Sequence, residues 1–160
     1  MKKLILLLAI TVLGFSACKK EDTSAADASA AATAAAQAAA DDATIQAYIK
    51  ANNITATKDP SGVYYSVITA GAGAYPTSTS VISVNYTGTL VTGTQFDKGN
   101  LTNTALGGLI KGWQYGIPHI NAGGRIMLLI PSALGYGATG AGTIPANSVL
   151  VFTIDLISFR

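Results

Sequence analysis

Few side chains after residue 58 could act as acids, bases, nucleophiles or metal ligands. The acids there are Asp59, Asp97 and Asp155, the only histidine is His119, and there is no cysteine. A dedicated metal site needs several such ligands, and a glycosidase usually needs two carboxylates beside the bond that it cleaves. No Gly-x-Ser-x-Gly motif accompanies His119, which we expect to be a solvated turn residue. We therefore expect no metal site, no bound cofactor and no reaction that depends on paired titratable groups.

Residues 135–140, GYGATG, match the Gly-x-Gly-x-x-Gly pattern of dinucleotide-binding sites. Such a site requires the glycines to open a helix whose N-terminus holds the pyrophosphate. Here Gly142 and Pro145 follow almost at once, and neither favours a helix. We interpret this stretch as a glycine-rich loop between strands.

The same region is rich in aromatic side chains, including the only tryptophan of the chain, Trp113, which lies beside a glycine in LIKGWQYG. Taken one at a time, each aromatic residue could simply belong to a hydrophobic core. Their surroundings form five motifs that are more informative together. The motifs are VNYTG (84–88), FD (96–97), GLIKGW (108–113), GYGATG (135–140) and IPANSVLVF (144–152).

In their order and spacing these five motifs resemble the FKBP-type peptidyl-prolyl isomerases, the immunophilins that bind macrolide immunosuppressants. The resemblance covers about residues 61–160. It implies a half-barrel antiparallel sheet curved around one short α-helix, an α+β fold. It also implies an apolar pocket in which the bond before a proline rotates between cis and trans.

The resemblance assigns Trp113 to the floor of that pocket, at the start of the helix, where a substrate proline ring would sit. The tryptophan would then be a platform for the ring. Other side chains would form aromatic walls and aliphatic lining. These are Tyr86, Phe96, Phe152, Leu109, Ile110 and Ile144.

Polar groups at the pocket are implied in the same way. The backbone N–H of Ile110 and the hydroxyl of Tyr136 would donate hydrogen bonds to substrate carbonyls. Asp97 would sit at the pocket edge, where it either orders the loop that carries Phe96 or contacts the substrate directly.

Two segments depart from the family pattern. The loop at 98–105 is shorter than in the best-known members, and residues 101–104 are Leu, Thr, Asn and Thr where a further pocket aromatic is usual. The tip at 140–143 is also shortened. We expect one wall of the pocket to be missing, which affects substrate preference and affinity for macrolide inhibitors.

Hydrophobic periodicity independently outlines an antiparallel sheet around one short helix. Alternating, β-rich stretches separated by Gly, Pro, Ser and Asn turns predict strands at 63–69, 81–90, 125–130 and 149–158. An irregular loop is expected at 92–106, and a short helix at 109–115. In the last strand Leu150, Phe152, Ile154 and Leu156 share one face, which should point into the core.

The N-terminus has the pattern of an export signal. Lys2 and Lys3 precede an uncharged, mostly apolar run that ends in small residues before Cys18, so residues 1–17 are expected to be a signal peptide. Cys18 resembles the lipidated cysteine of a bacterial lipobox, although cleavage could instead leave a free thiol. The chain would then be anchored to the outer membrane, on its periplasmic face or at the cell surface.

The predicted organisation has three further segments. Residues 18–42 form an Ala-rich tether, residues 43–58 form a short amphipathic helix with a linker, and residues 59–160 form the isomerase domain. Without residues 1–17 the chain keeps eight basic residues (10 minus 2) against eight acidic residues. This balance offers no basic stripe for phosphates, so nucleic acid is not an expected partner.

The expected function is a tethered peptidyl-prolyl isomerase that assists folding of exported proteins and acts on proline-containing polypeptides. One alternative is a binding module or chaperone that captures proline-containing segments on the same fold without turnover. Another is a purely structural surface lipoprotein in which every aromatic side chain is core.

Overall fold

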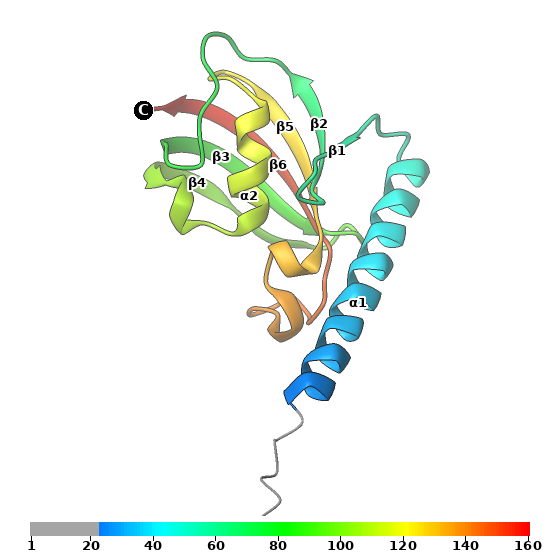
Figure 1. Ribbon diagram of the computed structural model, residues 1–160. Helices are drawn as coiled ribbons and strands as arrows, with labels where there is room; N and C mark the ends of the chain where they lie inside the picture. Colours follow the sequence, from blue (N-terminus) through cyan, green and yellow to red (C-terminus); the bar gives the residue numbers. More distant parts are fainter. Residues whose placement is uncertain (1–22) are drawn as a thin grey trace, which may run out of the picture.

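A six-stranded antiparallel sheet forms the centre of the computed structural model, which describes residues 23–160 (Figure 1). Its order is β1-β2-β5-β6-β3-β4. The strands are β1 (Thr57–Lys58), β2 (Tyr64–Thr69), β3 (Val81–Leu90), β4 (Gln95–Ala105), β5 (Arg125–Ile130) and β6 (Leu150–Phe159). Helix α2 (Lys111–Gly116) lies on one face of the sheet, and the long helix α1 (Thr23–Ala51) packs against the other. Short 3₁₀ turns occupy Leu106–Gly108, Ile117–His119, Ser132–Leu134 and Gly137–Thr139.

The predicted fold class, a curved antiparallel sheet with one short helix inside it, is confirmed. Strands β3 and β5 have the predicted bounds, and β2, β6 and α2 begin one or two residues later than predicted. The loop expected at 92–106 was wrong, because most of it is strand β4. This edge strand pairs only with β3 and exposes most of its side chains, so it has no hydrophobic alternation to reveal it.

The core on the α2 side of the sheet is built from the predicted face of β6, whose Leu150, Phe152, Ile154 and Leu156 are all buried. Glycines bring α2 close to this face. A Cβ atom on Gly112 would lie 2.6 Å from Cδ1 of Ile130, and one on Gly116 would lie 2.5 Å from Cδ1 of Leu128. Any larger residue at either position would push the helix, and the tryptophan that it carries, away from the sheet.

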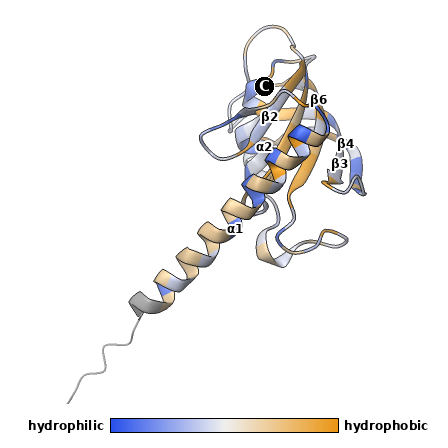
Figure 2. Cartoon of the chain, turned by 90° about the vertical axis from the view of Figure 1, so that its right-hand side faces the viewer, coloured by the Kyte–Doolittle hydropathy of each residue, from blue (hydrophilic) through white to orange (hydrophobic). Residues whose placement is uncertain are grey.

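The opposite face of the sheet is covered near β2 by the C-terminal half of α1. Ile45 is fully buried there against a second apolar cluster that includes Tyr64, Leu129, Val149 and Val151. The described part of the predicted tether and the predicted amphipathic helix therefore form one continuous helix. Its N-terminal half continues beyond the sheet as an Ala-rich rod (Figure 2).

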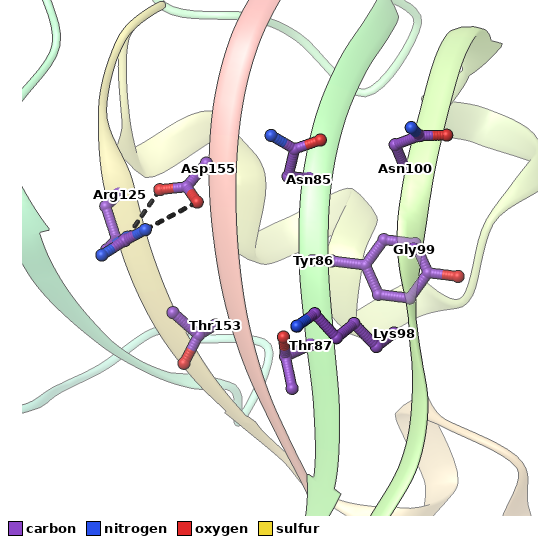
Figure 3. Close-up of a pocket in the computed structure, with 9 residues that line it drawn as sticks. All are labelled: Asn85, Tyr86, Thr87, Lys98, Gly99, Asn100, Arg125, Thr153 and Asp155. Carbon is purple, nitrogen blue, oxygen red and sulfur yellow. Dashed lines mark hydrogen bonds and ion pairs between the residues drawn. The ribbon is translucent and has the colours of Figure 1, made fainter.

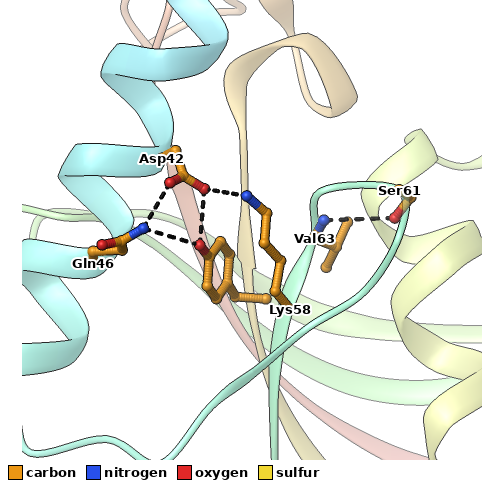
Figure 4. Close-up of polar contacts among 6 residues, drawn as sticks. Asp42, Gln46, Lys58, Ser61 and Val63 are labelled. Atoms are coloured by element: carbon orange, nitrogen blue, oxygen red, sulfur yellow. Dashed lines mark hydrogen bonds and ion pairs between the residues drawn. The ribbon is translucent and has the colours of Figure 1, made fainter.

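Polar contacts also fix α1 to the sheet (Figure 4). Asp42 accepts a hydrogen bond from the Tyr64 hydroxyl at 2.8 Å and pairs with Lys58, and Gln46 donates to its second oxygen at 2.7 Å. Lys58 and then Tyr64 hold the pKa of the Asp42 carboxyl below its ordinary value. The helix is thus joined to β1 and β2 by both apolar and charged groups.

Within residues 23–160, no helix has the length and apolar character required to cross a membrane. The predicted signal peptide (1–17) and Cys18 lie outside the described residues.

Replacing Ile45 should detach α1 from the sheet. Ile45→Ala removes a fully buried side chain, so the free energy of unfolding should fall by about 2–4 kcal/mol in urea denaturation. The matched control is Ile157→Ala, since Ile157 is more than half exposed on β6 and should change stability by about 0.5 kcal/mol or less. Equal effects of the two substitutions would contradict the packing of α1 described above.

Candidate active site

Four aromatic rings from β3, β4, α2 and β6 meet on the α2 side of the sheet. The ring centroids of Tyr86 and Trp113 are 5.2 Å apart with planes at 77°, and those of Trp113 and Phe152 are 5.2 Å apart at 89°. Phe96 meets Phe152 at 5.4 Å and 84°. Each contact is edge-to-face, the arrangement that aromatic quadrupoles favour, so the rings hold one another in fixed orientations.

Beside these rings lies a cavity of about 180 Å³. This is smaller than the roughly 300–1,000 Å³ of pockets for drug-sized ligands, and it suits a single small ring. Its lining comes from β3, β4, α2, the residues before α2, and the loop after β5. The lining residues are Tyr86, Asp97, Leu101, Leu109, Ile110, Trp113 and Tyr136.

The indole of Trp113 is only 4% exposed yet still borders the cavity. Its Nε1 atom is buried and has no hydrogen-bond partner among residues 23–160. The indole therefore presents carbon surface to the cavity and no hydrogen-bond donor.

Six of the nine predicted site residues line this cavity, while Phe96, Phe152 and Ile144 do not. Phe152 packs against Trp113, and Phe96 packs against Phe152, so both support the lining from behind. Ile144 is buried in the same core cluster. The six that line the cavity are Tyr86, Asp97, Leu109, Ile110, Trp113 and Tyr136.

Tyr86 and Asp97 are linked across the mouth of the cavity. The Tyr86 hydroxyl donates to Oδ2 of Asp97 at 2.9 Å. Burial, and then this hydrogen bond and the charge of Asp97, raise the pKa of Tyr86 above its ordinary value. The contact joins β3 to β4, and Asp97 also borders the cavity itself.

The backbone before α2 is held by Gln114, a residue outside the site predicted from the sequence. Its Nε2 donates to the carbonyl oxygens of Leu109 at 2.7 Å and Gly107 at 3.1 Å. In the loops and turns of residues 23–160, the N–H of Ile110 donates to no backbone carbonyl. Gln114 thus fixes the extended backbone that leads into α2, and the N–H of Ile110 is left for an acceptor from outside. A polar residue next to the tryptophan was the only sequence signal.

Leu101 is a second residue of the site that was not predicted from the sequence. It lies on β4 opposite Val84 and lines the cavity. An aliphatic side chain thus stands where the family resemblance led us to expect a gap in the wall.

The FKBP-type peptidyl-prolyl cis-trans isomerase family model matches residues 73–157, which is more than half of the chain and includes the whole aromatic cluster. The chain belongs to this family.

Several named FKBP proteins are similar to this chain. It is 38% identical over 120 residues to the FKBP-type peptidyl-prolyl cis-trans isomerase FkpA of Aeromonas hydrophila, which covers 72% of this chain and 44% of the relative. The crystal structure of FkpA from Escherichia coli superposes with a TM-score of 0.67 and 33% identity, over 86% of this chain and 69% of that one. An isomerase of Pseudomonas syringae pv. tomato gives a TM-score of 0.66 and 28% identity, over 78% and 94%. The chain spans less than half the length of the FkpA relatives.

His119 is not the solvated turn residue that the sequence suggested. Its ring stacks on Tyr65 with centroids 3.9 Å apart and planes at 7°, and its Nε2 lies 3.0 Å from Oδ2 of Asp59. Burial alone would raise the pKa of Asp59, but hydrogen bonds from Ser61 and His119 lower it. These groups join the turn before β2 to the segment after α2, away from the FKBP cavity.

A larger hollow of about 540 Å³ lies elsewhere on the sheet (Figure 3). Its lining is mainly polar and includes Asn85, Lys98 and Asn100. It also holds the Arg125–Asp155 pair, with nitrogen–oxygen distances of 2.6 and 2.8 Å. Arg125 holds the pKa of the Asp155 carboxyl below its ordinary value. Arg125 and Asp155 satisfy one another there, and polar side chains make up much of the remaining lining, so the hollow differs in character from the cavity beside Trp113.

Gly88 is a further residue on which the FKBP site depends. A Cβ atom at this position would lie 2.6 Å from Cε2 of Phe96 and 2.8 Å from Cε1 of Phe152. The Phe152 ring is buried and the Phe96 ring packs against it edge to face, so neither ring moves without disturbing the other. The final glycine of VNYTG is therefore required for the edge-to-face contact between the two phenylalanines.

Gly88→Ala should destabilise the protein by about 1–3 kcal/mol through overpacking and should weaken the near-ultraviolet circular dichroism of the aromatic cluster. The control is Gly99→Ala on neighbouring β4, where the nearest atom to an added Cβ would be the Tyr86 hydroxyl at 3.5 Å, an ordinary contact. If the two variants have the same stability and spectrum, the structural role assigned to Gly88 is wrong.

Proposed function

We propose that this chain catalyses cis–trans isomerisation of the peptide bond before proline in polypeptide substrates. The observation that carries the proposal is the cavity of about 180 Å³ bordered by Trp113, with aliphatic and aromatic side chains around it. The proline ring would lie against the indole, and the chain on either side of it would cross the rim formed by β3, β4 and the loop after β5.

The reaction needs no proton transfer. Rotation about the bond meets a barrier of about 20 kcal/mol, because amide resonance must be broken, and it takes tens to hundreds of seconds without a catalyst. The twisted amide has less charge separation than the planar one, so a site with little water and few charges disfavours the planar ground state relative to it. A millionfold acceleration would need about 8 kcal/mol of such differential stabilisation.

Two donors at the rim would orient the substrate. The N–H of Ile110, which has no backbone acceptor in the loops of residues 23–160, would donate to a substrate carbonyl oxygen. The exposed Tyr136 would donate to another through its hydroxyl. Asp97 already accepts a hydrogen bond from Tyr86, so its proposed role is to hold Tyr86 and the β4 wall in position, with direct substrate contact as the second possibility.

The proposal is tested with a proline-containing peptide in a protease-coupled or NMR exchange assay. We expect the wild-type protein to accelerate isomerisation, and Trp113→Ala to lose at least tenfold in kcat/KM, which corresponds to about 1.4 kcal/mol. Tyr115→Ala is the matched control, since Tyr115 is an exposed aromatic residue on the same helix and does not border the cavity. Tyr86→Phe tests the Asp97 contact separately.

No acceleration by the folded wild-type protein would overturn the isomerase proposal. The second candidate function, a binding module for proline-containing segments, would then predict a change of Trp113 fluorescence on titration with the same peptide. It is motivated by Leu101 on the wall formed by β4. Macrolide inhibitors would occupy the same cavity. Their affinity would show how Leu101 on β4 affects ligand binding.

We further propose that the chain is exported and anchored through Cys18, so that it acts on exported proteins near the outer membrane. The sequence pattern of residues 1–18 supports this proposal. Multiple acyl chains would hold the protein firmly, at about 0.8 kcal/mol per buried CH₂.

Mass spectrometry of the mature protein should find an acylated Cys18 as its first residue, and Cys18→Ser should move the protein from the membrane fraction to the soluble fraction. An intact N-terminus, or an unmodified thiol at Cys18, would contradict the anchor and would leave the isomerase proposal standing.

A further inference from the structure

Helix α1 is joined to the loop after β5 by one buried carboxylate. Oδ2 of Asp41 accepts hydrogen bonds from the N–H of Ser132 at 2.8 Å and from its hydroxyl at 2.7 Å, across 91 residues of sequence. Asp41 is 2% exposed and Ser132 is 1% exposed. The other oxygen, Oδ1, accepts from Nε2 of Gln37 at 2.8 Å. The carboxylate is thus removed from water, and both of its oxygens accept hydrogen bonds from the protein.

This contact supplies the cap that the 3₁₀ turn Ser132–Leu134 lacks in its own sequence. The residue before the turn is Pro131, which makes no side-chain cap. The first N–H groups of such a turn have no partner within the turn and need an acceptor from elsewhere. Asp41 provides that acceptor from a different element, and a charged acceptor makes a stronger hydrogen bond than a neutral one.

The capped turn leads directly to the site. The Ser132 carbonyl accepts a hydrogen bond from the N–H of Gly135 at 3.0 Å, and Tyr136, which borders the cavity, follows. Among residues 23–160, the Tyr136 hydroxyl forms no hydrogen bond with another side chain, and the ring is exposed. No side-chain hydrogen bond within this range fixes the position of this hydroxyl, so we expect its position to depend on the backbone of residues 132–139.

We propose that Asp41 is a positioning residue for prolyl isomerisation, acting through the Ser132 turn to hold Tyr136 at the rim of the cavity. The proposal rests on the proposed isomerase function. It gives α1 a second role besides linking. Docking of the helix through Asp41 and the position of Tyr136 at the cavity then depend on each other. An undocked α1 would leave Ser132 without its buried partner and would release the loop that carries Tyr136.

The neighbouring residue provides a matched control. Asp42 also lies on α1 and also anchors the helix, but its partners are Tyr64, Lys58 and Gln46, none of which belongs to the 132–139 loop. Asp42→Ala removes these contacts but leaves buried Ile45 and the Asp41–Ser132 hydrogen bonds in place, so α1 should stay docked and the Ser132 turn should stay capped.

The experiment compares Asp41→Ala, Asp41→Asn and Asp42→Ala for isomerisation of a proline peptide at a temperature where all are folded by circular dichroism. We expect Asp41→Ala to lower kcat/KM about five- to tenfold and Asp41→Asn to restore part of the loss, since the amide oxygen can still accept the Ser132 hydrogen bonds but carries no negative charge. Asp42→Ala should stay within about twofold of the wild type. Ser132→Ala, which removes only the hydroxyl contact, is the variant to use if Asp41→Ala is unfolded.

Two further measurements separate positioning from general stability. In a Tyr136→Phe background, Asp41→Ala should have less than a twofold effect, because the hydroxyl through which it acts is already gone. Amide hydrogen exchange at residues 133–139 should be faster in Asp41→Ala and unchanged in Asp42→Ala. Exchange is measured on the protein alone and needs no turnover.

The outcomes are distinguishable. A wild-type protein without isomerase activity would overturn the proposed function, and this role with it. An active wild type with full activity in Asp41→Ala would overturn only the positioning role. So would equal losses in Asp41→Ala and Asp42→Ala, an undiminished effect in the Tyr136→Phe background, or unchanged exchange at residues 133–139.

Discussion

The close approach of α2 to the sheet is the constraint on which the rest of the FKBP site depends. Gly112 and Gly116 lie one turn apart on the helix face that meets the sheet. A Cβ atom on Gly112 would overlap Ile130, and one on Gly116 would overlap Leu128. Because the helix lies so close, the indole of Trp113 can reach the rings of Tyr86 and Phe152. The glycine beside the tryptophan is therefore not incidental. It sets the depth of the cavity floor.

A site built in this way contributes shape and an apolar surface rather than reactive groups. Its only acid is Asp97, which accepts a hydrogen bond from Tyr86, and Trp113 offers carbon surface because its Nε1 is buried. These features would be faults in a hydrolase, which must move protons. For rotation about an amide bond they are suitable, since the planar amide carries more charge separation than the twisted one and gains more from water.

The sequence predicted those parts of the molecule whose physical signal is local. Strands β3 and β5 and the inner face of β6 followed from alternation, and six of the cavity residues were implied by the resemblance of five motifs to the FKBP family. Strand β4 was missed because an exposed edge strand owes its place to backbone pairing with β3 and not to side-chain burial. The docking of α1 was missed because Asp41 and Ser132 meet across 91 residues. From the sequence alone, an aspartate at the end of an Ala-rich stretch is expected to be solvated.

The docked half of α1 also accounts for the helical state of its exposed half. An isolated Ala-rich helix of this length is marginal in water, because the first turn must be nucleated at a cost in backbone entropy. Ile45, Asp41 and Asp42 anchor the C-terminal turns to the domain, so each further residue towards Thr23 needs only propagation, for which alanine has the best propensity. At 1.5 Å per residue, residues 23–40 then extend roughly 27 Å. The alanines act as a rod whose direction is set where it meets the domain, and a flexible linker would not fix that direction.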